Sequence, residues 1–221
     1  MTTGHNVHLL PQTDQLRAMH TIIRDKDCSR ADFVFYARRV IRLLLEHGLN
    51  LLPFTEKKVT TPVGATYPGL EFASKICAVP VIRAGEAMES ELRDVCPGIR
   101  LGKILIQRDK RTKQPHLYYK HLPDDIAQRH VLLLEPMLAT AGSALAAVDV
   151  LAEAGVREDR IIMINFLSSP EGLRRIAAER PRLRIVTSAI EDQLNEHAFM
   201  IPGIGDFGDR FFGTIDAGSQ R

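Results

Sequence analysis

An acid, a proline and a loop of small residues follow four apolar residues near the middle of the chain. The apolar run 131–134 has the composition of a buried parallel strand, and Glu135 stands directly after it. The loop 139–143 contains Thr140 and Ser143, and a good helix-forming sequence begins after it. A strand, a tight loop and a helix start gather backbone N–H groups and hydroxyls around an anion, so this stretch predicts a phosphate site.

The carboxylate of Glu135 limits what else can bind there. A negative charge beside a phosphate pocket repels the phosphate, so Glu135 is expected to accept hydrogen bonds from a neutral group. Sugar hydroxyls meet this requirement. The stretch therefore predicts a site for a phosphorylated sugar. The alternative is an ordinary strand-to-helix turn in which a Ser or Thr caps the helix.

Two arginines also stand where strands are expected to end. Arg83 follows the strand 76–82 and precedes Gly85, and Arg108 follows the strand 100–107. Ligands of open α/β sheets bind beyond the carboxyl ends of the strands, and a guanidinium group binds phosphate oxygens in pairs. Each arginine alone is better interpreted as a surface residue. Together with the acid and loop at a third strand end, they predict a second anion site.

Strands and helices alternate along most of the chain. This alternation favours an α/β fold with a mostly parallel sheet and helices on both faces. Strands are expected at 7–10, 76–82, 100–107, 131–134, 160–167 and 183–189. Helices are expected from 13 or 14 to 24, from 29 to 48, from 86 to 95, from the loop 139–143 to 154, and from 171 to 180. Gly48 is expected to end its helix in a left-handed cap.

Three other segments interrupt this alternation. Residues 57–62 and 67–72 are expected to be extended and joined through Gly64. The strand 100–107 and a returning strand that begins at 117 are expected to form a β-hairpin arm with a charged tip. The C-terminal segment 201–214 is rich in glycine and has no helical period, so it is expected to be irregular.

Length, charge and cysteine content restrict the class of protein. The 221 residues suffice for one α/β domain, 1–221, in which 1–6 and 215–221 are expected to be mobile. The net charge is only +2 and no apolar run reaches bilayer length, so neither nucleic acid nor a membrane is a predicted partner. The three cysteines are far apart and outside any CxxC motif, which fits reduced thiols in the cytoplasm and predicts no zinc site.

The chain resembles the uracil phosphoribosyltransferase family from about Val7 to Thr214. The segments that carry this resemblance occur in the order 82–86, 107–109, 135–143 and 202–214, and the last marks the uracil enzymes among phosphoribosyltransferases. Ala141 and Phe207 resemble the eukaryotic type. The resemblance implies a type I phosphoribosyltransferase fold with a hairpin arm and a C-terminal base-binding segment. It also implies a pentosyltransferase of pyrimidine salvage, which converts uracil and 5-phosphoribosyl 1-pyrophosphate (PRPP) to UMP and pyrophosphate.

The resemblance also implies a role for each site residue. The implied PRPP-binding residues are Arg83, Arg108, Glu135, Pro136, Met137, Leu138, Ala139, Thr140, Ala141, Gly142, Ser143 and Asp206. The implied uracil-binding residues, acting largely through main-chain groups, are Met200, Gly205, Asp206 and Phe207. Arg83 and Arg108 would stabilise the leaving pyrophosphate, and Asp206 is a candidate proton acceptor. A glycine-rich segment can bring its backbone edge against a planar base.

Further implications concern metal and partners. Pro136 stands where many phosphoribosyltransferases carry a second acid, so no protein metal site is expected and Mg²⁺ would arrive on the substrate. The resemblance further implies a homodimer or homotetramer, with GTP as a candidate activator.

Glu135 departs from the family, which usually has Asp at this position. The extra methylene moves the carboxylate by about one C–C bond length, so either the loop adjusts or activity falls. A second hypothesis is therefore a catalytically weak or inactive homologue that acts as a uracil or UMP sensor or an RNA-binding regulator. The absence of a basic, aromatic-rich patch argues against RNA.

Overall fold

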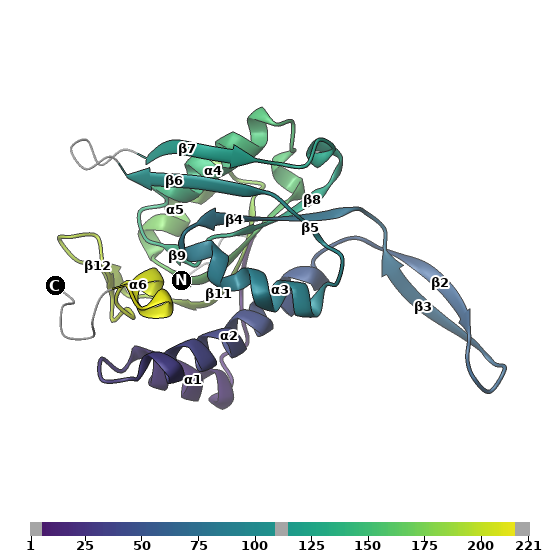
Figure 1. Cartoon of the computed structure of the whole chain (residues 1–221), viewed down its shortest axis with the longest axis horizontal. Coiled ribbons are helices and arrows are strands. Elements are labelled where there is room, and N and C mark those ends of the chain that lie inside the picture. Colours follow the sequence, from purple (N-terminus) through teal and green to yellow (C-terminus); the bar gives the residue numbers. More distant parts are fainter. Residues whose placement is uncertain (1–5, 109–114, 215–221) are drawn as a thin grey trace.

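The computed structural model describes residues 6–108 and 115–214, and of Arg108 the main chain alone (Figure 1). The strands are β1 (Val7–Leu9), β2 (Phe54–Thr60), β3 (Thr66–Phe72), β4 (Ile76–Ile82), β5 (Arg100–Leu101), β6 (Lys103–Arg108), β7 (Pro115–His121), β8 (His130–Leu134), β9 (Met137–Leu138), β10 (Ile161–Ser168), β11 (Arg184–Ile190), β12 (Gln193–Leu194) and β13 (Met200–Ile201). The α-helices are α1 (Asp14–Arg24), α2 (Arg30–Asn50), α3 (Glu89–Val95), α4 (Gly142–Glu153), α5 (Pro170–Glu179) and α6 (Phe207–Phe212), and 3₁₀ turns occupy Ala84–Met88, Ile126–Gln128 and Glu158–Arg160.

A central sheet has the strand order β1-β11-β10-β8-β4-β6-β7, with β5 beside β4 and β9 beside β10. Its strands pair in parallel except for the antiparallel pair β6–β7. The helices α1, α2 and α6 pack with one core cluster and α4 and α5 with the other, so both faces of the sheet are covered (Figure 1). The predicted fold class is confirmed.

Burial on both faces explains the unbroken apolar runs in the sequence. In β8, Leu132 and Leu134 belong to one core cluster, while Val131 and Leu133 belong to the other. Successive side chains of a strand point to opposite faces, so a strand between two helical layers needs an apolar residue at every position. The run 131–134 therefore marks the middle of the sheet.

Gly48 does not end its helix, and this prediction is wrong. Helix α2 continues through Gly48 to Asn50. A Cβ placed on Gly48 would lie 2.3 Å from Cδ1 of Ile164 in β10. The glycine is therefore required because the helix backbone lies against the sheet at this point, and its local sequence does not contain that information.

The predicted hairpin, a strand ending near 107 and a strand returning from about 117, is confirmed and lies at the edge of the central sheet. Strands β6 and β7 pair antiparallel as part of the central sheet, and the predicted tip at 109–114 lies outside the described residues. The hairpin that projects from the body is β2–β3, whose register runs from Phe54↔Phe72 to Thr60↔Thr66 (Figure 1). Gly64 in its turn has a φ of 80°, which glycine adopts without steric cost.

Two further expectations concern the chain ends. The termini 1–5 and 215–221 lie outside the described residues. The carbonyl of Asn6 accepts a hydrogen bond from Ile185 N at 2.8 Å, and the mobility expected for 1–6 stays a prediction. The C-terminal segment is not wholly irregular, since α6 forms with Asp206 as its N-cap and Gly213 beyond its end. A helix of six residues is too short to show a period in the sequence.

Candidate active site

Three neighbouring strands end side by side at one edge of the sheet. The register pairs Pro80 of β4 with Leu134 of β8, and Leu134 with Ile164 of β10. Arg83 and Glu135 therefore leave adjacent strands at the same edge of the sheet, with Arg83 two residues farther along its strand. A Cβ on Gly85 would lie 2.2 Å from the carbonyl oxygen of Leu134. The turn after β4 thus packs directly on the end of β8.

Glu135 and Pro136 separate strand β8 from strand β9, and both of these strands pair with β10. After β8 ends, Met137 and Leu138 form β9 and pair with Leu167 and Ser168 of the same β10. The carbonyl of Pro136 accepts hydrogen bonds from Phe166 N at 2.8 Å and Leu167 N at 3.0 Å. Glu135, Pro136 and Leu138 are buried. The stretch 135–138 is therefore built into the sheet edge.

Asn165 supports this break and was missed in the sequence. Its amide nitrogen donates to the carbonyls of Glu135 at 2.8 Å and Pro136 at 2.9 Å. Its amide oxygen accepts from Ser168 Oγ at 2.6 Å and Thr187 Oγ1 at 3.1 Å. The side chain is fully buried, and every polar atom is used. The available signal was one polar residue in the apolar run 161–167, since a buried amide needs partners.

The loop after β9 gives its carbonyl oxygens to helix α5. Ser169 N donates to Leu138 O at 2.8 Å, Ser169 Oγ donates to Ala139 O at 2.6 Å, and an Arg175 guanidinium N–H donates to Thr140 O at 3.1 Å. These bonds direct the negative ends of the loop's peptide groups into the fold. The N–H groups of α4 begin directly after them, which is the arrangement of an anion site.

The start of α4 decides against the alternative of an ordinary capped turn. The N-cap residue is Ala141, with a left-handed φ of 63°, and no side chain caps the helix. Thr140, Gly142 and Ser143 are half-buried, and so is Ala139. A Ser- or Thr-capped turn is therefore wrong, and the small residues surround the N-terminus of a twelve-residue helix.

Arg83 joins the sheet edge to the C-terminal segment. It donates to Asp209 Oδ1 at 2.5 Å and to Thr214 Oγ1 at 2.9 Å, and its guanidinium lies 5.7 Å from the centre of the Phe212 ring. Hydrogen bonds from Thr214 and from Arg83 lower the pKa of Asp209. A guanidinium has five N–H donors, so these two bonds leave donor capacity for an anion. The peptide bond before Arg83 is cis.

Asp206 lies beside Arg83. A Cβ placed on Gly208 would lie 3.3 Å from Arg83 Nη2 and 3.4 Å from Asp206 Oδ1, so both groups border the same glycine. Asp206 Oδ1 caps α6 by accepting from Asp209 N at 2.8 Å. Asp206 and Gly205 are exposed. Oδ1 of the Asp206 carboxylate therefore serves as the cap of α6. Oδ2 is the second oxygen of the same carboxylate.

Two of the expected base-binding residues direct their side chains into the core. Phe207 is 1% exposed, and its ring lies 5.2 Å from Phe166 and 5.8 Å from Phe33. Met200 is also buried, in the short strand β13. Their side chains fix the segment against α2 and β10, so any contact with a ligand must come from the main chain.

Arg108 is the last residue of β6, where its main chain pairs with Pro115. Strand β6 reaches the site strand β4 through the pairs Val81↔Ile104 and Ile82↔Leu105. Arg108 therefore lies beyond the end of β4, on the same edge as Arg83. Its contact with an anion stays a prediction, because its side chain is outside the described part of the chain.

Among residues 6–108 and 115–214, no cluster of three His, Cys, Asp or Glu side chains could hold a metal ion. Within the same residues, no helix is long and apolar enough to cross a bilayer.

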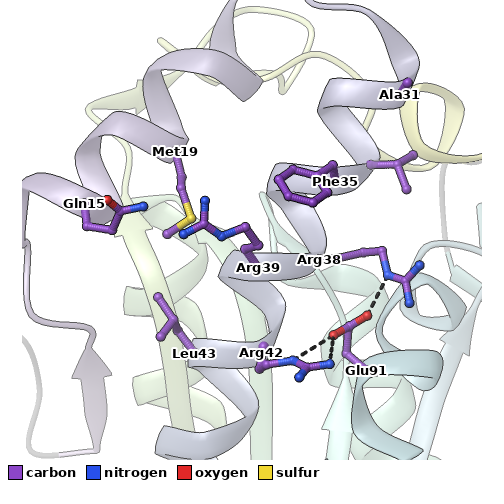
Figure 2. Close-up of a pocket in the computed structure, with 10 residues that line it drawn as sticks. Gln15, Met19, Ala31, Phe35, Arg38, Arg39, Arg42, Leu43 and Glu91 are labelled. Atoms are coloured by element: carbon purple, nitrogen blue, oxygen red, sulfur yellow. Dashed lines mark hydrogen bonds and ion pairs between the residues drawn. The ribbon is translucent and has the colours of Figure 1, made fainter. Parts of the chain in front are cut away.

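A groove lined by residues of α1, α2 and α3 shares no lining residue with the sheet edge described above (Figure 2). Its volume is about 640 Å³, and it is lined by Gln15, Met19, Ala31, Val34, Phe35, Arg38, Arg39, Arg42, Leu43 and Glu91. Glu91 accepts from Arg38 Nε at 2.6 Å and Arg42 Nη2 at 2.7 Å. Burial opposes ionisation of Glu91, but these bonds and charges outweigh it and lower the pKa. Three guanidinium groups and one carboxylate line this groove, and Asp94 beside it also pairs with Arg42 at 3.4 Å.

Comparison with known proteins identifies the family. Residues 10–214 match the family model for uracil phosphoribosyltransferase. The chain is 52% identical to a uracil phosphoribosyltransferase of Dictyostelium discoideum, over 98% of this chain and all of that one. It is 51% identical to uracil phosphoribosyltransferase 1 of Schizosaccharomyces pombe, over 95% of each chain.

A solved structure supports the same fold. The AQ2163 protein of Aquifex aeolicus superposes with a TM-score of 0.82 at 26% identity, over 93% of this chain and 97% of that one. The sequence match covers residues 10–214, which include the mostly parallel sheet, the loop after β8 and the C-terminal segment. The chain belongs to the uracil phosphoribosyltransferase family.

Proposed function

We propose that the chain transfers the phosphoribosyl group of PRPP to uracil, giving UMP and pyrophosphate in pyrimidine salvage. The observation that carries this proposal is the bond network from Arg83 to Asp209 and Thr214. It joins a strand-end arginine to the C-terminal segment, at the edge where the loop 135–143 begins. In this proposal the loop would bind the phosphate, Glu135 would bind the sugar, and the exposed backbone at Gly205 would read the base of one bound substrate pair.

The loop 135–143 would hold the ribose 5-phosphate. Thr140 and Ser143 supply hydroxyls, and the N-terminus of α4 supplies N–H groups and a favourable dipole. Pro136, Met137 and Leu138 lie in or beside the short strand β9, so we assign them main-chain roles. Glu135 would accept hydrogen bonds from ribose hydroxyls.

The reaction breaks the C1′–O bond to pyrophosphate and forms a bond from uracil N1 to C1′. Positive charge develops on the sugar, and negative charge develops on the leaving group. Arg83 and Arg108 would stabilise the leaving pyrophosphate, and this preorganised charge would lower the barrier. Asp206 Oδ2 is our candidate acceptor for the uracil N1 proton, because Oδ1 already caps α6.

The donor set fits a Mg²⁺ ion that is bound mainly by the substrate. Glu135 is the one carboxylate in the loop 135–143, and Pro136 follows it. The ion would supply further neutralisation of the pyrophosphate charge. A chelator is expected to abolish UMP formation without lowering the unfolding temperature of the free protein. A lowered unfolding temperature would indicate a protein-held metal instead.

The direct test is UMP formation by the purified protein with uracil, PRPP and Mg²⁺. We expect turnover by the wild type, and by the Glu135→Asp variant. Both main-chain groups of Glu135 are bonded: its N–H donates to Ile164 O at 3.1 Å, and its carbonyl accepts from the Asn165 amide. Uracil binding without turnover, restored to turnover by Glu135→Asp, would overturn the enzyme proposal in favour of the sensor.

GTP is our candidate activator, with the groove on α1 and α2 as its site. The groove combines excess guanidinium charge with the ring of Phe35 (Figure 2), which suits a phosphorylated purine. GTP is expected to raise the wild-type rate, and Arg39→Ala is expected to remove that response while keeping the basal rate. Arg157→Ala, at an exposed ion pair, is the control. A wild type that ignores GTP would overturn this proposal.

We also propose a homo-oligomer that uses the β2–β3 hairpin. Val63, Tyr67 and Leu70 are 88%, 59% and 68% exposed on a hairpin that stands clear of the body (Figure 1). Exposed apolar clusters of this kind mark protein interfaces. Light scattering is expected to give a dimer or tetramer, and Tyr67→Ser with Leu70→Ser is expected to shift it toward the monomer. A monomeric wild type would contradict the proposal.

We propose a cytoplasmic location, which suits the three unpaired thiols Cys28, Cys77 and Cys96. Fractionation of the source cells with an antibody against the protein tests this. Recovery in an organelle or membrane fraction would contradict it.

A further inference from the structure

A buried ion pair joins two elements from opposite ends of the chain. Arg24 is the last residue of α1, and Glu191 directly follows β11. Their bonds are Arg24 Nη2 to Glu191 Oε1 at 2.5 Å and Arg24 Nη1 to Glu191 Oε2 at 3.0 Å. The Glu191 side chain is fully buried, and the Arg24 side chain is 23% exposed.

Both members of this pair also bind the main chain of Gly203. Gly203 N donates to Glu191 Oε2 at 2.7 Å, and Arg24 Nη1 donates to Gly203 O at 2.9 Å. Gly203 has a φ of 69°, and a Cβ placed on it would lie 2.2 Å from Met200 O. One ion pair therefore binds both the main-chain N–H and the main-chain carbonyl of Gly203. Any other residue at this position would force the backbone near Met200 to shift.

We infer that Arg24 and Glu191 are positioning residues for the base site. Gly203 lies two residues before Gly205, where the exposed backbone that would read uracil begins. A buried ion pair contributes little net stability compared with an apolar pair, but it fixes one geometry because each charge must keep its partner. This inference rests on the proposed function, since it assigns the pair to the uracil end of that reaction.

The pair has a counterpart that serves as a control. Arg129 and Asp125 form a bidentate ion pair with two 2.7 Å bonds, and Arg129 Nη1 donates to Ile76 O at 3.1 Å. This pair also joins an arginine to a carboxylate and to a main-chain carbonyl. It lies at the start of β4, at the opposite end of that strand from Arg83. Asp125→Asn therefore tests the effect of weakening a partly buried ion pair away from the site.

The test is steady-state kinetics of Glu191→Gln, Arg24→Lys and Asp125→Asn with uracil and PRPP varied separately. Glu191→Gln is expected to raise KM for uracil about 10-fold to 100-fold, because small displacements of a binding group weaken productive alignment. We expect KM for PRPP and kcat to stay within about twofold of wild type. Arg24→Lys keeps the charge and should show a smaller rise. Asp125→Asn should change neither KM.

Amide hydrogen exchange separates this inference from the proposed function. Glu191→Gln is expected to speed exchange at 200–207 and to leave 135–143 unchanged, whether or not the protein makes UMP. A wild type without turnover would overturn the proposed function alone. Unchanged exchange at 200–207, or an equal rise in both KM values, would overturn the positioning role. If Glu191→Gln does not fold, Arg24→Lys is judged by the same two measurements.

Discussion

The loop 135–143 is held by the next strand and helix along the chain, whereas the C-terminal segment 200–214 is held by charged groups from distant elements. The loop's carbonyls bond to β10 and α5. The C-terminal segment is bonded by Arg83 after β4 and by the pair Arg24–Glu191. A loop beside a sheet inherits its position from the strands. A segment without long strands needs specific side chains, so remote substitutions should affect it more.

The largest effect is expected at Arg83, which joins the two regions. Arg83→Ala removes the bonds to Asp209 and Thr214 together with the contact to the leaving pyrophosphate that we propose, so kcat/KM should fall about 100-fold or more. Arg83→Lys keeps the charge but loses the planar fork and should fall less. Steady-state UMP formation measures both. Arg93→Ala, at an ion pair within α3, is the control. A variant within threefold of wild type would contradict a shared role.

Substitution of one of two glycines should disturb one region alone: Gly172 contacts the loop 135–143, and Gly203 lies in the C-terminal segment. A Cβ on Gly172 would lie 2.5 Å from Ala139 O, and a Cβ on Gly203 would lie 2.2 Å from Met200 O. Gly172→Ala should therefore shift the loop and raise KM for PRPP, while Gly203→Ala should raise KM for uracil, each by about 30-fold. Kinetics with each substrate varied gives the answer. The comparison fails if both variants raise the same KM.

A smaller effect is expected at Asn165, because β9 still pairs with β10 without it. Asn165→Leu removes the amide that donates to the Glu135 carbonyl, while the hydroxyls of Ser168 and Thr187 keep their bonds to each other and to Ala189 O. The change should cost about 1–3 kcal/mol of unfolding free energy. KM for PRPP should rise about tenfold. Ser168→Ala keeps both amide donors and should leave KM for PRPP closer to wild type. Urea unfolding and kinetics measure these quantities, and a rise in KM for uracil instead would refute the assignment.

The smallest effect on activity is expected at His20, whose Nε2 bonds to Ser188 Oγ at 3.0 Å and whose titration affects stability instead. Burial and the charge of Arg24 lower the pKa of His20 from 6.5 to about 4, against the opposing charge of Glu191. Between these values the unfolded chain binds a proton that the folded chain does not. The free energy of unfolding should therefore fall as pH decreases through this window, by about 3 kcal/mol at most.

His20→Gln should flatten this pH dependence, because glutamine does not titrate. The exposed His197→Gln variant should keep the wild-type slope. Urea unfolding at several pH values between 4 and 6.5 measures the difference. Equal slopes for His20→Gln and wild type would show that His20 is not the group responsible.

The sequence alone determined the elements whose signals are local. The helices expected to start near 13 and 29, the strand at the apolar run 131–134 and the helix after the small-residue loop all form. Parallel strands end at one edge, so the placement of Arg83 near Glu135 also followed from the sequence. These rules relate residues a few positions apart, or elements ordered by a common topology.

Tertiary structure alone decided which distant groups meet. Gly48 is fixed by Ile164, Asn165 by the carbonyls of the loop, and Gly203 by Arg24 and Glu191. Gly48 and Gly203 look like ordinary helix-end or turn glycines in the sequence, and Arg24 looks like a surface residue. Their roles arise from contacts across more than a hundred residues in two of the three cases. Local spacing carries no information about such contacts, because close approach depends on the packing of the whole chain.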